Sequence, residues 1–501
     1  MNDHEPVAYQ ENEEIEQGHV WVRKGRSSCE QYPGRFRGKL VNGDARFILL
    51  NRLNKIMGGF TCTASLNEEA IVFTIKNIDE KISNLCFPPP IKSFVEVPDA
   101  RINNYYWIQQ YTTCSSMRSN LQIMDLMGAW YSHTLWQGIW RNLSTQFMYG
   151  HLLSSNNLEA ALPRGEALDE HEAAMIQNVP EKYRYNSAGL GRASSFNLLS
   201  EVNPDDSVAP CYNRETGNLT WAMHNYYLYY RYSMDDSLLL YKIYPLLNTW
   251  KDILANLIDY PVNETGFMIG KDVALETAHR HFSSMMMIYP FGIFSAFSKA
   301  NETLIRKSIN YWTTLSGNDR SVWSYSWAAG AYAYLQDGKE AYKNLQSFFK
   351  YSKRKNYYDL PGIGDNTMHR EVGMCAETPF SFVKSLNEML LQSHNGVVKI
   401  FPAMPAAWQE ALFVNQRTEV AFLIAALRKN GQTNFFSAES LIGGQCFIKS
   451  DIAVGSLQST SNNRISKTSA FVFSLNRTKG EKVSFYRKGN KDSSDGHIAR
   501  S

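Results

Sequence analysis

Hydrophobic and polar positions alternate with a period of two over residues 1–95, which predicts a β region. The runs FRGKLV and ARFILL are typical strand sequences, and Asn42-Gly43 stands between them. Both central residues of a tight hairpin turn must accept positive φ, so an Asn-Gly between two such runs predicts a β-hairpin. Three consecutive prolines at 88–90 are expected to close the region, because proline cannot donate a ladder hydrogen bond.

The hydrophobic period becomes that of α-helices from residue 96 to residue 396. The stretch WAMHNYYLYYRY (221–232) carries aromatic rings on nearly every face, which is typical of a helix buried on several sides. Another helix is expected over residues 233–247, with Asp or Ser as its N-cap and Pro245 ending or kinking it. Helices joined by short turns over this length predict stacked antiparallel hairpins, in a solenoid or in a closed α/α toroid.

Beyond Asn395-Gly396 the period returns to two. Residues 397–488 are expected to form a small antiparallel β module, with a second hairpin turn at Asn430-Gly431. The polar residues 489–501 are expected to be a disordered tail. The predicted fold is therefore α+β and multidomain, with the helical domain at 96–396 flanked by two β regions.

The composition is that of a large globular chain. Of its 501 residues, 44% are hydrophobic and 20% charged, and 51 basic against 48 acidic residues give a net charge of +3. Without a concentrated basic cluster, the sequence predicts neither a nucleic acid partner nor an anionic membrane surface as partner. No run of about 18 apolar residues occurs, so no membrane insertion is expected, and the first residues do not form an export signal. The sequence leaves the oligomeric state open.

Metal and cofactor motifs are missing from the sequence. His171-Glu172 begins an H-E-x-x-H pattern, but Met175 stands where the second histidine would be. The seven cysteines are scattered without a C-x-x-C pair, and no glycine-rich phosphate loop occurs. We therefore expect no metal and no cofactor.

The segment AHRHFSSMMMIYPFG (278–292) is a candidate for chemistry. It places His279, Arg280 and His281 beside an apolar run. Imidazole and guanidinium groups can hold sugar hydroxyls, so these residues predict either the polar rim of a pocket or satisfied structural side chains. The aromatic residues, 13% of the chain, likewise serve either as core or as platforms for sugars.

A second candidate is the segment CAETPFSFVKSLNEMLLQS (375–393). It predicts a helix with Thr378 as N-cap and Pro379 at the first helical position. Glu377 then stands just before the helix, where the positive end of the helix dipole favours an ionised carboxylate. This carboxylate either stabilises the helix or is an anion kept deprotonated for chemistry.

Eight segments in a fixed order resemble glycoside hydrolase family 95 and its bacterial relatives. They lie within residues 100–445 and read MDLMGAWYSHTLWQGIWRNLSTQFMYG, VPEKYRYNSAGLGRASSF, GNLTWAMHNYYLYYRYSMDD, YPVNETGFMIGKDV, AHRHFSS, SYSWAAGAYAYLQDG, AETPFSFVKSLNEMLLQS and FPAMPAAW. The resemblance implies an (α/α)6 toroid between an N-terminal β-sandwich, of which residues 1–95 would be a portion, and a C-terminal β module. It also implies a carbohydrate substrate and inverting hydrolysis of α-L-fucosides, or of α-L-galactosides in some members, which are often secreted or periplasmic.

The same resemblance implies roles for individual residues. In the family, an Asn-x-Asn pair polarised by a carboxylate activates water, because a neutral amide alone is a poor base. Asn142 and Ser144 match this pair, and Glu377 matches the supporting carboxylate. The other matched positions resemble the sugar-binding pocket of the family: Trp221, His224, His279, Arg280, His281 and Trp327.

Two departures from the family pattern bear on activity. Ser144 replaces the second asparagine and lacks the two-ended relay of an amide. The Ser-Pro-Glu motif that carries the general acid in the family occurs nowhere in this sequence. Loss of such a proton donor typically slows a reaction by roughly 10²–10⁴. Two alternatives follow: an active α-L-fucosidase-like hydrolase, or a catalytically impaired relative that binds sugar or has a structural role.

Asn142-Leu143-Ser144 is also an N-glycosylation sequon. Its neighbours Trp136, Trp140 and Tyr149 indicate burial. We therefore expect Asn142 to face a buried site and not to carry a glycan.

Overall fold

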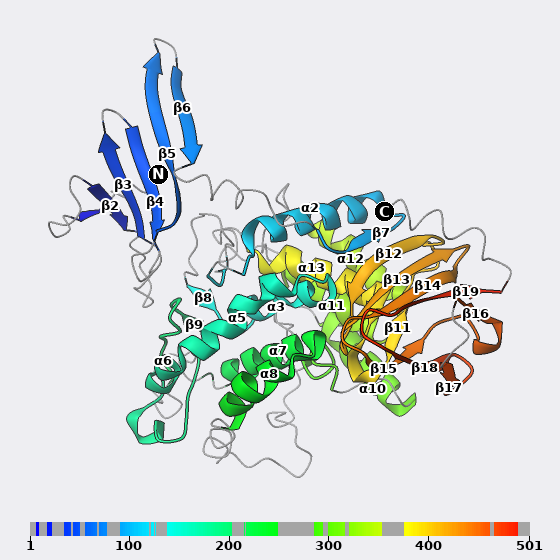
Figure 1. The fold of residues 1–501 in the computed structure, drawn as a ribbon. Coiled ribbons are helices and arrows are strands. Elements are labelled where there is room, and N and C mark those ends of the chain that lie inside the picture. The colour runs from blue at the N-terminus through cyan, green and yellow to red at the C-terminus, as the bar shows by residue number, and fades with distance from the viewer. Residues whose placement is uncertain are drawn as a thin grey trace.

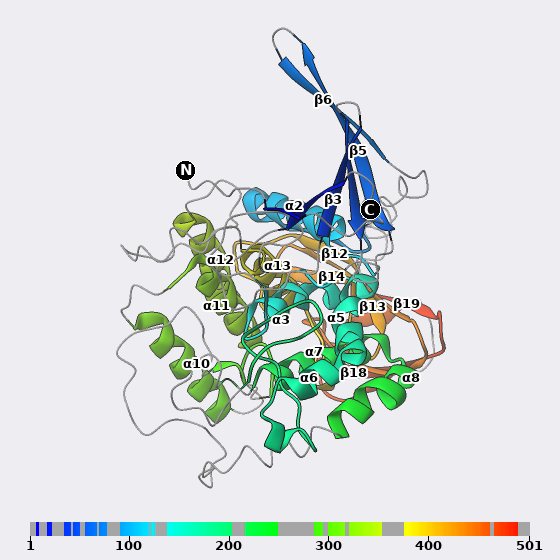
Figure 2. The ribbon, with the colours of Figure 1, turned by 90° about the vertical axis from the view of Figure 1, so that its left-hand side faces the viewer.

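The computed structural model describes the backbone of six N-terminal strands and, with side chains, long stretches of the chain beyond residue 90. These stretches are residues 91–119, 122–124, 126, 138–202, 215, 217–248, 285–293, 299–315, 320–352, 375–460 and 465–488. Helices and sheets are combined in them, as Figures 1 and 2 show, which confirms the expected mixed fold class. The closed toroid stays a prediction, because residues 249–284 and 353–374, which belong to the helical domain, lie outside the described ranges.

The N-terminal strands form one antiparallel sheet in the order of the sequence. They are β1 (Val7–Tyr9), β2 (Gly18–Val22), β3 (Arg35–Val41), β4 (Asp44–Leu50), β5 (Ile56–Asn67) and β6 (Ala70–Asn77). Val41 at the end of β3 lies opposite Asp44 at the start of β4, which confirms the hairpin predicted from Asn42-Gly43. The described strands before residue 91 thus make a single sheet, and the second layer of a sandwich is not among them.

The helical part is built around one buried helix, α13 (Glu377–Leu390). Every residue of α13 except Lys384 is buried, because α2, α3, α4, α11 and α12 pack around it (Figure 1). The described helices are α2 (Ala100–Ser116), α3 (Ser144–Met148), α4 (Gly150–Ser154), α5 (Leu158–Glu170), α6 (Glu172–Gln177), α7 (Asn218–Ser233), α8 (Asp236–Leu238), α10 (Lys299–Thr314), α11 (Val322–Tyr334), α12 (Gly338–Tyr351) and α13.

The two helices predicted over residues 221–247 are present. In α7 the expected burial holds for the first half, through Tyr226, whereas Tyr227 in the second half is 38% exposed. Asp235 caps α8 by accepting hydrogen bonds from the amides of Ser237 and Leu238. The helix then passes through a π-helical turn, η3 (Leu239–Ile243), before it reaches Pro245. Such a turn relieves the clash between a proline ring and the preceding carbonyl groups, so the helix is distorted rather than ended.

The C-terminal strands form two sheets. One has the order β10-β11-β15-β18-β17 and the other β16-β19-β14-β13-β12-β7. The strands are β7 (Phe94–Glu96), β10 (Leu391–Gln392), β11 (Val398–Ile400), β12 (Ala411–Arg417), β13 (Phe422–Lys429), β14 (Gln432–Ser440), β15 (Gly444–Lys449), β16 (Leu457–Ser459), β17 (Ile465–Lys467), β18 (Val472–Arg477) and β19 (Lys482–Arg487). Asn430 and Gly431 between β13 and β14 both have positive φ, 50° and 71°, which confirms the second predicted hairpin.

Two pairings in these sheets differ from the expected antiparallel module. Strand β11 pairs with β15 in parallel, because the chain visits the other sheet before it returns beside β11. Strand β7, which precedes the helical part in the sequence, pairs with β12 at the edge of the second sheet. Both pairings join segments that are far apart in the sequence. One hydrophobic core extends from Tyr106 and Phe382 in the helices to Phe413 and Phe436 in the sheets.

Candidate functional site

Glu377 is the first residue of α13, with Ala376 in the N-cap position. The predicted N-cap, Thr378, and Pro379 therefore lie inside the first turn, and the predicted start of the helix was two residues late. The physical reason is a backbone contact: the amide of Ala376 donates to the carbonyl of Leu126 at 2.8 Å, which fixes the start of the helix without a side-chain cap. The Glu377 carboxylate, 3% exposed, remains in the first turn, where the helix dipole stabilises an anion.

Packing on both sides brings the segment of Asn142 and Ser144 to the start of α13. On the upstream side, Trp140 packs against Cys375 and Leu126. On the downstream side, Met148 and Tyr149 share a hydrophobic cluster with Phe380. The two segments run side by side between these contacts, and α3, which Ser144 begins, packs against α13. Asn142, Ser144 and Glu377 therefore lie in one region of the molecule.

The turn that carries Asn142 is tied down by its own side chains. The Thr145 hydroxyl donates to the carbonyl of Trp140 at 2.7 Å, and the Gln146 amide donates to the carbonyl of Arg141 at 3.1 Å. Ser144 is 5% exposed, and Asn142 is half-buried. Attachment of a glycan needs an open loop, so this burial favours the expectation that the sequon is not used.

Two of the predicted sugar-binding rings belong to an aromatic cluster. Trp221 meets Phe147 edge-on with centroids 5.6 Å apart, and Trp327 meets Tyr289 edge-on at 5.6 Å. Phe147 and Tyr289 are themselves 6.2 Å apart, which joins the two tryptophans in one cluster. Both tryptophans are buried, so they fill the core behind the site and do not offer an open face to a sugar.

His224 lines a pocket, and three of the predicted residues cannot be placed. The His224 ring packs edge-on against Phe291 with centroids 4.7 Å apart. Burial, with the charges of Arg164 and Lys384, lowers its pKa to about 4, so the ring is neutral at neutral pH and can donate or accept one hydrogen bond. His279, Arg280 and His281 lie outside the described residues.

The pocket at His224 lies further along α13 than Glu377. His224 was predicted as pocket lining, whereas Arg164, Lys384 and Glu388 were not. Its empty space is about 650 Å³, a volume that includes the solvent at its mouth. Side chains from α3, α5, α7, α13 and the loop after β12 converge on it. The lining residues are Gln146, Phe147, Gly150, Leu153, Arg164, His224, Asn225, Leu228, Tyr232, Pro290, Phe291, Tyr334, Lys384, Glu388, Ser393, His394 and Glu419.

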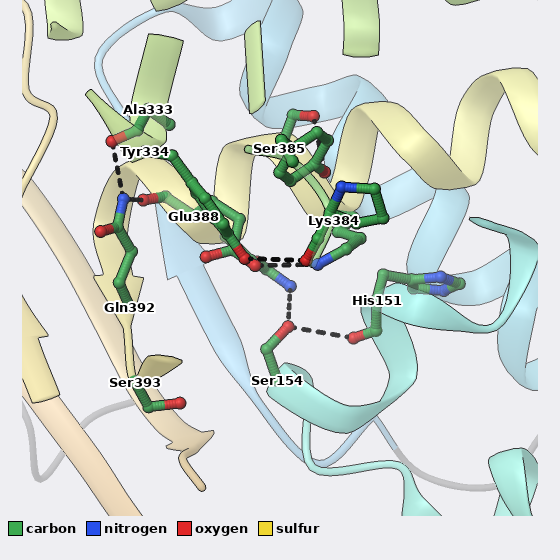
Figure 3. A network of polar contacts seen from close by, with 12 residues as sticks. His151, Ser154, Ala333, Tyr334, Lys384, Ser385, Glu388, Gln392 and Ser393 are labelled. Carbon is green, nitrogen blue, oxygen red and sulfur yellow. Dashed lines mark hydrogen bonds and ion pairs between the residues drawn. The ribbon is translucent and has the colours of Figure 1, made fainter. Parts of the chain in front are cut away.

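Two ion pairs order the charged side of this pocket. Lys384 Nζ lies 2.8 Å from Glu388 Oε1, one helical turn along α13. Figure 3 shows the pair between α13 and the helix that carries His151 and Ser154. Burial alone would lower the pKa of Lys384, but the Glu388 carboxylate raises it above its usual value and keeps the ammonium charged. Gln392 holds the end of the helix by donating to the carbonyls of Ala333 and Glu388.

The second ion pair joins Glu419 to Arg231 of α7, with 3.1 Å between Oε2 and Nε. Burial raises the pKa of Glu419, although the Arg231 charge opposes the shift. Val420 and Ala421 follow Glu419 with φ of 63° and 55°. A β-branched residue rarely adopts positive φ, so this loop is strained. The amide of Val420 donates to the carbonyl of Arg231 at 2.9 Å, which holds the loop in place.

The pocket and the predicted catalytic residues are thus neighbours along α13 without being the same place. Glu377 begins the helix, whereas Lys384 and Glu388 lie in its later turns. The described side chains include no group of three His, Cys, Asp or Glu that could hold a metal ion. Nor is any helix of the described chain long and apolar enough to cross a membrane.

Comparisons with known proteins find a family similarity in the helical part of the chain. Residues 249–390 match the model of the glycosyl hydrolase family 95 catalytic domain, and this stretch includes Glu377, Lys384 and Glu388. Alpha-L-fucosidase 2 of Arabidopsis thaliana is 21% identical over 382 residues, which cover 59% of this chain and 44% of that protein. The chain therefore spans less than half the length of this curated relative.

Two solved structures have a low similarity to this fold. The structure titled "Putative kojibiose phosphorylase from human microbiome" has a TM-score of 0.45 and 10% sequence identity, over 89% of this chain and 80% of that chain. Streptomyces avermitilis alpha-L-rhamnosidase complexed with L-rhamnose has a TM-score of 0.37 and 8% identity, over 84% of this chain and 44% of that chain. The domain match and the fucosidase alignment both rest on the sequence, and they show that part of the chain is similar to the catalytic domain of glycoside hydrolase family 95.

Proposed function

We propose that this chain acts on terminal α-L-fucose or α-L-galactose residues of a carbohydrate, at the start of α13. The observation that supports the proposal is the packing of α3, which Ser144 begins, against α13, which Glu377 begins. The match to the family 95 catalytic domain and the fucosidase relative support the substrate class. The proposal includes the (α/α)6 toroid as the arrangement of the helical domain.

Each of the three residues has a part in an inverting reaction. Asn142 accepts a hydrogen bond from the attacking water. The Glu377 carboxylate draws the N–H proton of the Asn142 amide toward itself, which makes the amide oxygen more basic. Glu377 suits this part because the helix N-terminus favours an ionised carboxylate, while burial holds the side chain in one orientation. Ser144 orients the amide or the water through its hydroxyl, since it can both donate and accept.

The wall of the pocket supplies the sugar contacts. His224 is neutral and half-buried, so it can bond a sugar hydroxyl without the desolvation cost of a charge. Trp221 and Trp327 support this wall from the core. His279, Arg280 and His281 stay predicted sugar contacts.

The missing Ser-Pro-Glu motif determines which substrates can react. An inverting enzyme without a general acid depends on a leaving group that departs unprotonated. We therefore expect α-L-fucosyl fluoride to be hydrolysed, and a fucosylated oligosaccharide to react more slowly by roughly 10²–10⁴ than in a relative that has the acid.

The test compares these two substrates with four proteins. Fluoride release and fucose release are measured for the natural chain, for Glu377→Ala and for Asn142→Ala, with Glu181→Gln at an exposed position as the control. Both site variants should lose roughly 10²-fold or more of the rate on the fluoride, and the control should lose none. Absence of hydrolysis of the fluoride by the natural chain at high protein concentration would reject the hydrolase.

The alternative function is that of a catalytically impaired relative that binds sugar. It is favoured by Ser144 in place of the second asparagine and by the absence of the general-acid motif from the sequence. Calorimetric titration with L-fucose separates the two: binding of the sugar without hydrolysis of the fluoride supports this alternative, and a chain that does neither contradicts both.

A further inference from the structure

We infer that Arg164 and Arg141 form an anion subsite on the α5 side of the pocket, suited to a sugar that carries a carboxylate or sulfate group. Arg164 lines the pocket directly. Arg141, which is next to Asn142 in the sequence, does not line it but is close enough to Arg164 for the two charges to interact. This inference goes beyond the proposed hydrolysis of a neutral sugar.

Both arginines are buried, and neither has a compensating acid among the described residues. Arg141 is 0% and Arg164 3% exposed. Both terminal nitrogens of Arg141 and Nη1 of Arg164 have no hydrogen-bond partner among the described residues. An unpaired buried cation is costly, so such groups are normally found with a carboxylate, a phosphate or a bound ion.

The charge balance of the pocket points to the same conclusion. Lys384 is paired with Glu388, and Arg231 with Glu419. Among the described residues these pairs occupy both lining carboxylates, so Arg164, the other cation of the lining, has no carboxylate partner there.

The arginines are also held so that they cannot turn out into water. Nε of Arg141 donates to the hydroxyl of Ser194 at 3.2 Å. The guanidinium carbon of Arg164 lies 5.6 Å from the centre of the Tyr149 ring, which is a cation–π distance. Burial lowers the pKa of Arg141 to about 9 and that of Arg164 to about 10, so both are still charged at neutral pH.

The chemistry of guanidinium selects the class of ligand. Its planar fork matches the two oxygens of a carboxylate or sulfate group, whereas a sugar hydroxyl offers one oxygen and no charge. The neutral His224 and the amide of Gln146 line the same pocket and can bond the hydroxyls of the ring that carries the anion. A uronate or a sulfated sugar therefore fits this pocket better than a neutral sugar does.

The test is calorimetric titration with D-galacturonate, with D-galactose 6-sulfate, with neutral D-galactose and with inorganic sulfate. We expect both charged sugars to bind at least 10-fold more tightly than galactose, and more tightly than inorganic sulfate. Arg164→Gln should remove the advantage of the charged sugars, and Arg164→Lys, which keeps the charge but not the fork, should retain part of it. Arg184→Gln, at an exposed arginine, is the matched control and should change nothing.

Folding is checked with the same variants. Replacing Arg164 leaves no carboxylate unpaired among the described residues, so stability should not fall for that reason. Arg164→Gln should keep the thermal midpoint of the natural chain. The inference is overturned if galactose binds as tightly as its charged counterparts, if Arg164→Gln leaves their affinity unchanged, or if inorganic sulfate alone binds as tightly as the sulfated sugar. These titrations do not depend on hydrolysis and give the same answer in Glu377→Ala, so failure of the proposed function would leave the result readable.

Discussion

His151 illustrates how single buried residues set the pH range of this protein. His151 belongs to α4 and is buried. Its Nε2 lies 2.9 Å from the Thr113 hydroxyl, and its ring stacks on the Phe380 ring with centroids 5.0 Å apart. Burial lowers the pKa of His151 to about 3, whereas an unfolded histidine titrates near pH 6.5. Between these values only the unfolded chain takes up the proton.

Acid should therefore destabilise the protein through His151. Above pH 6.5 the ring is neutral in both states and its contribution is complete, and as the pH falls toward 3 the unfolded state gains protons and stability is lost. One such histidine contributes a slope of about 1.4 kcal/mol per pH unit. Urea unfolding at pH values from 7 to 4 should give a shallower decline for His151→Gln than for the natural chain. Equal slopes would contradict the linkage.

At the same scale, the sequence predicted some site residues and missed others for a physical reason. Glu377 could be proposed as a site residue from the sequence, because a helix start is a local signal, and its role stays a prediction. Lys384 and Glu388 could have been found, since a Lys and a Glu four residues apart on an apolar helix suggest a buried pair. Arg164 and Glu419 carry no local signal, because they meet the pocket only after α5 and the loop after β12 have packed onto α7 and α13.

At the level of elements, the contact of α5 with α7 and the contact of α11 with Tyr289 each need a glycine where the two sides approach closely. A Cβ at Gly165 of α5 would overlap with the ring of Tyr226, whose hydroxyl donates to Asp169 at 2.7 Å. A Cβ at Gly330 of α11 would overlap with the ring of Tyr289. Neither ring can retreat, because both are buried in packed clusters.

Gly330→Ala should therefore separate α11 from Tyr289 and destabilise the protein by about 1–3 kcal/mol, as overpacking of a core does. Guanidinium unfolding measures the change. Gly455→Ala is the matched control, because a Cβ there has open space, and it should change stability by less than about 0.5 kcal/mol. A loss at Gly455 as large as at Gly330 would show that helix contact is not the cause.

The elements themselves show how far local sequence reaches. The turns at Asn42-Gly43 and Asn430-Gly431 and the helices over 218–248 and 377–390 were predicted, because period and turn residues are local properties. The pairing of β7 with β12 and the parallel pairing of β11 with β15 were not, since a strand's choice of partner depends on packing between distant segments.

At the level of the whole molecule, the central proposal is that a site like that of family 95 enzymes lies at the start of α13. One hydrophobic core joins α13 to the C-terminal sheets, so the site and the β module are parts of one packed unit. The chain spans 44% of the length of the fucosidase relative, so its activity has to be measured on this chain itself.

The most direct measurement follows the hydrolysis of α-L-fucosyl fluoride by proton NMR and identifies the first anomer of fucose that forms. A single displacement by water held at Asn142 and Glu377 predicts β-L-fucose first, with the signal lost in Glu377→Ala. Appearance of α-L-fucose first, or an unchanged rate in Glu377→Ala, would contradict the account.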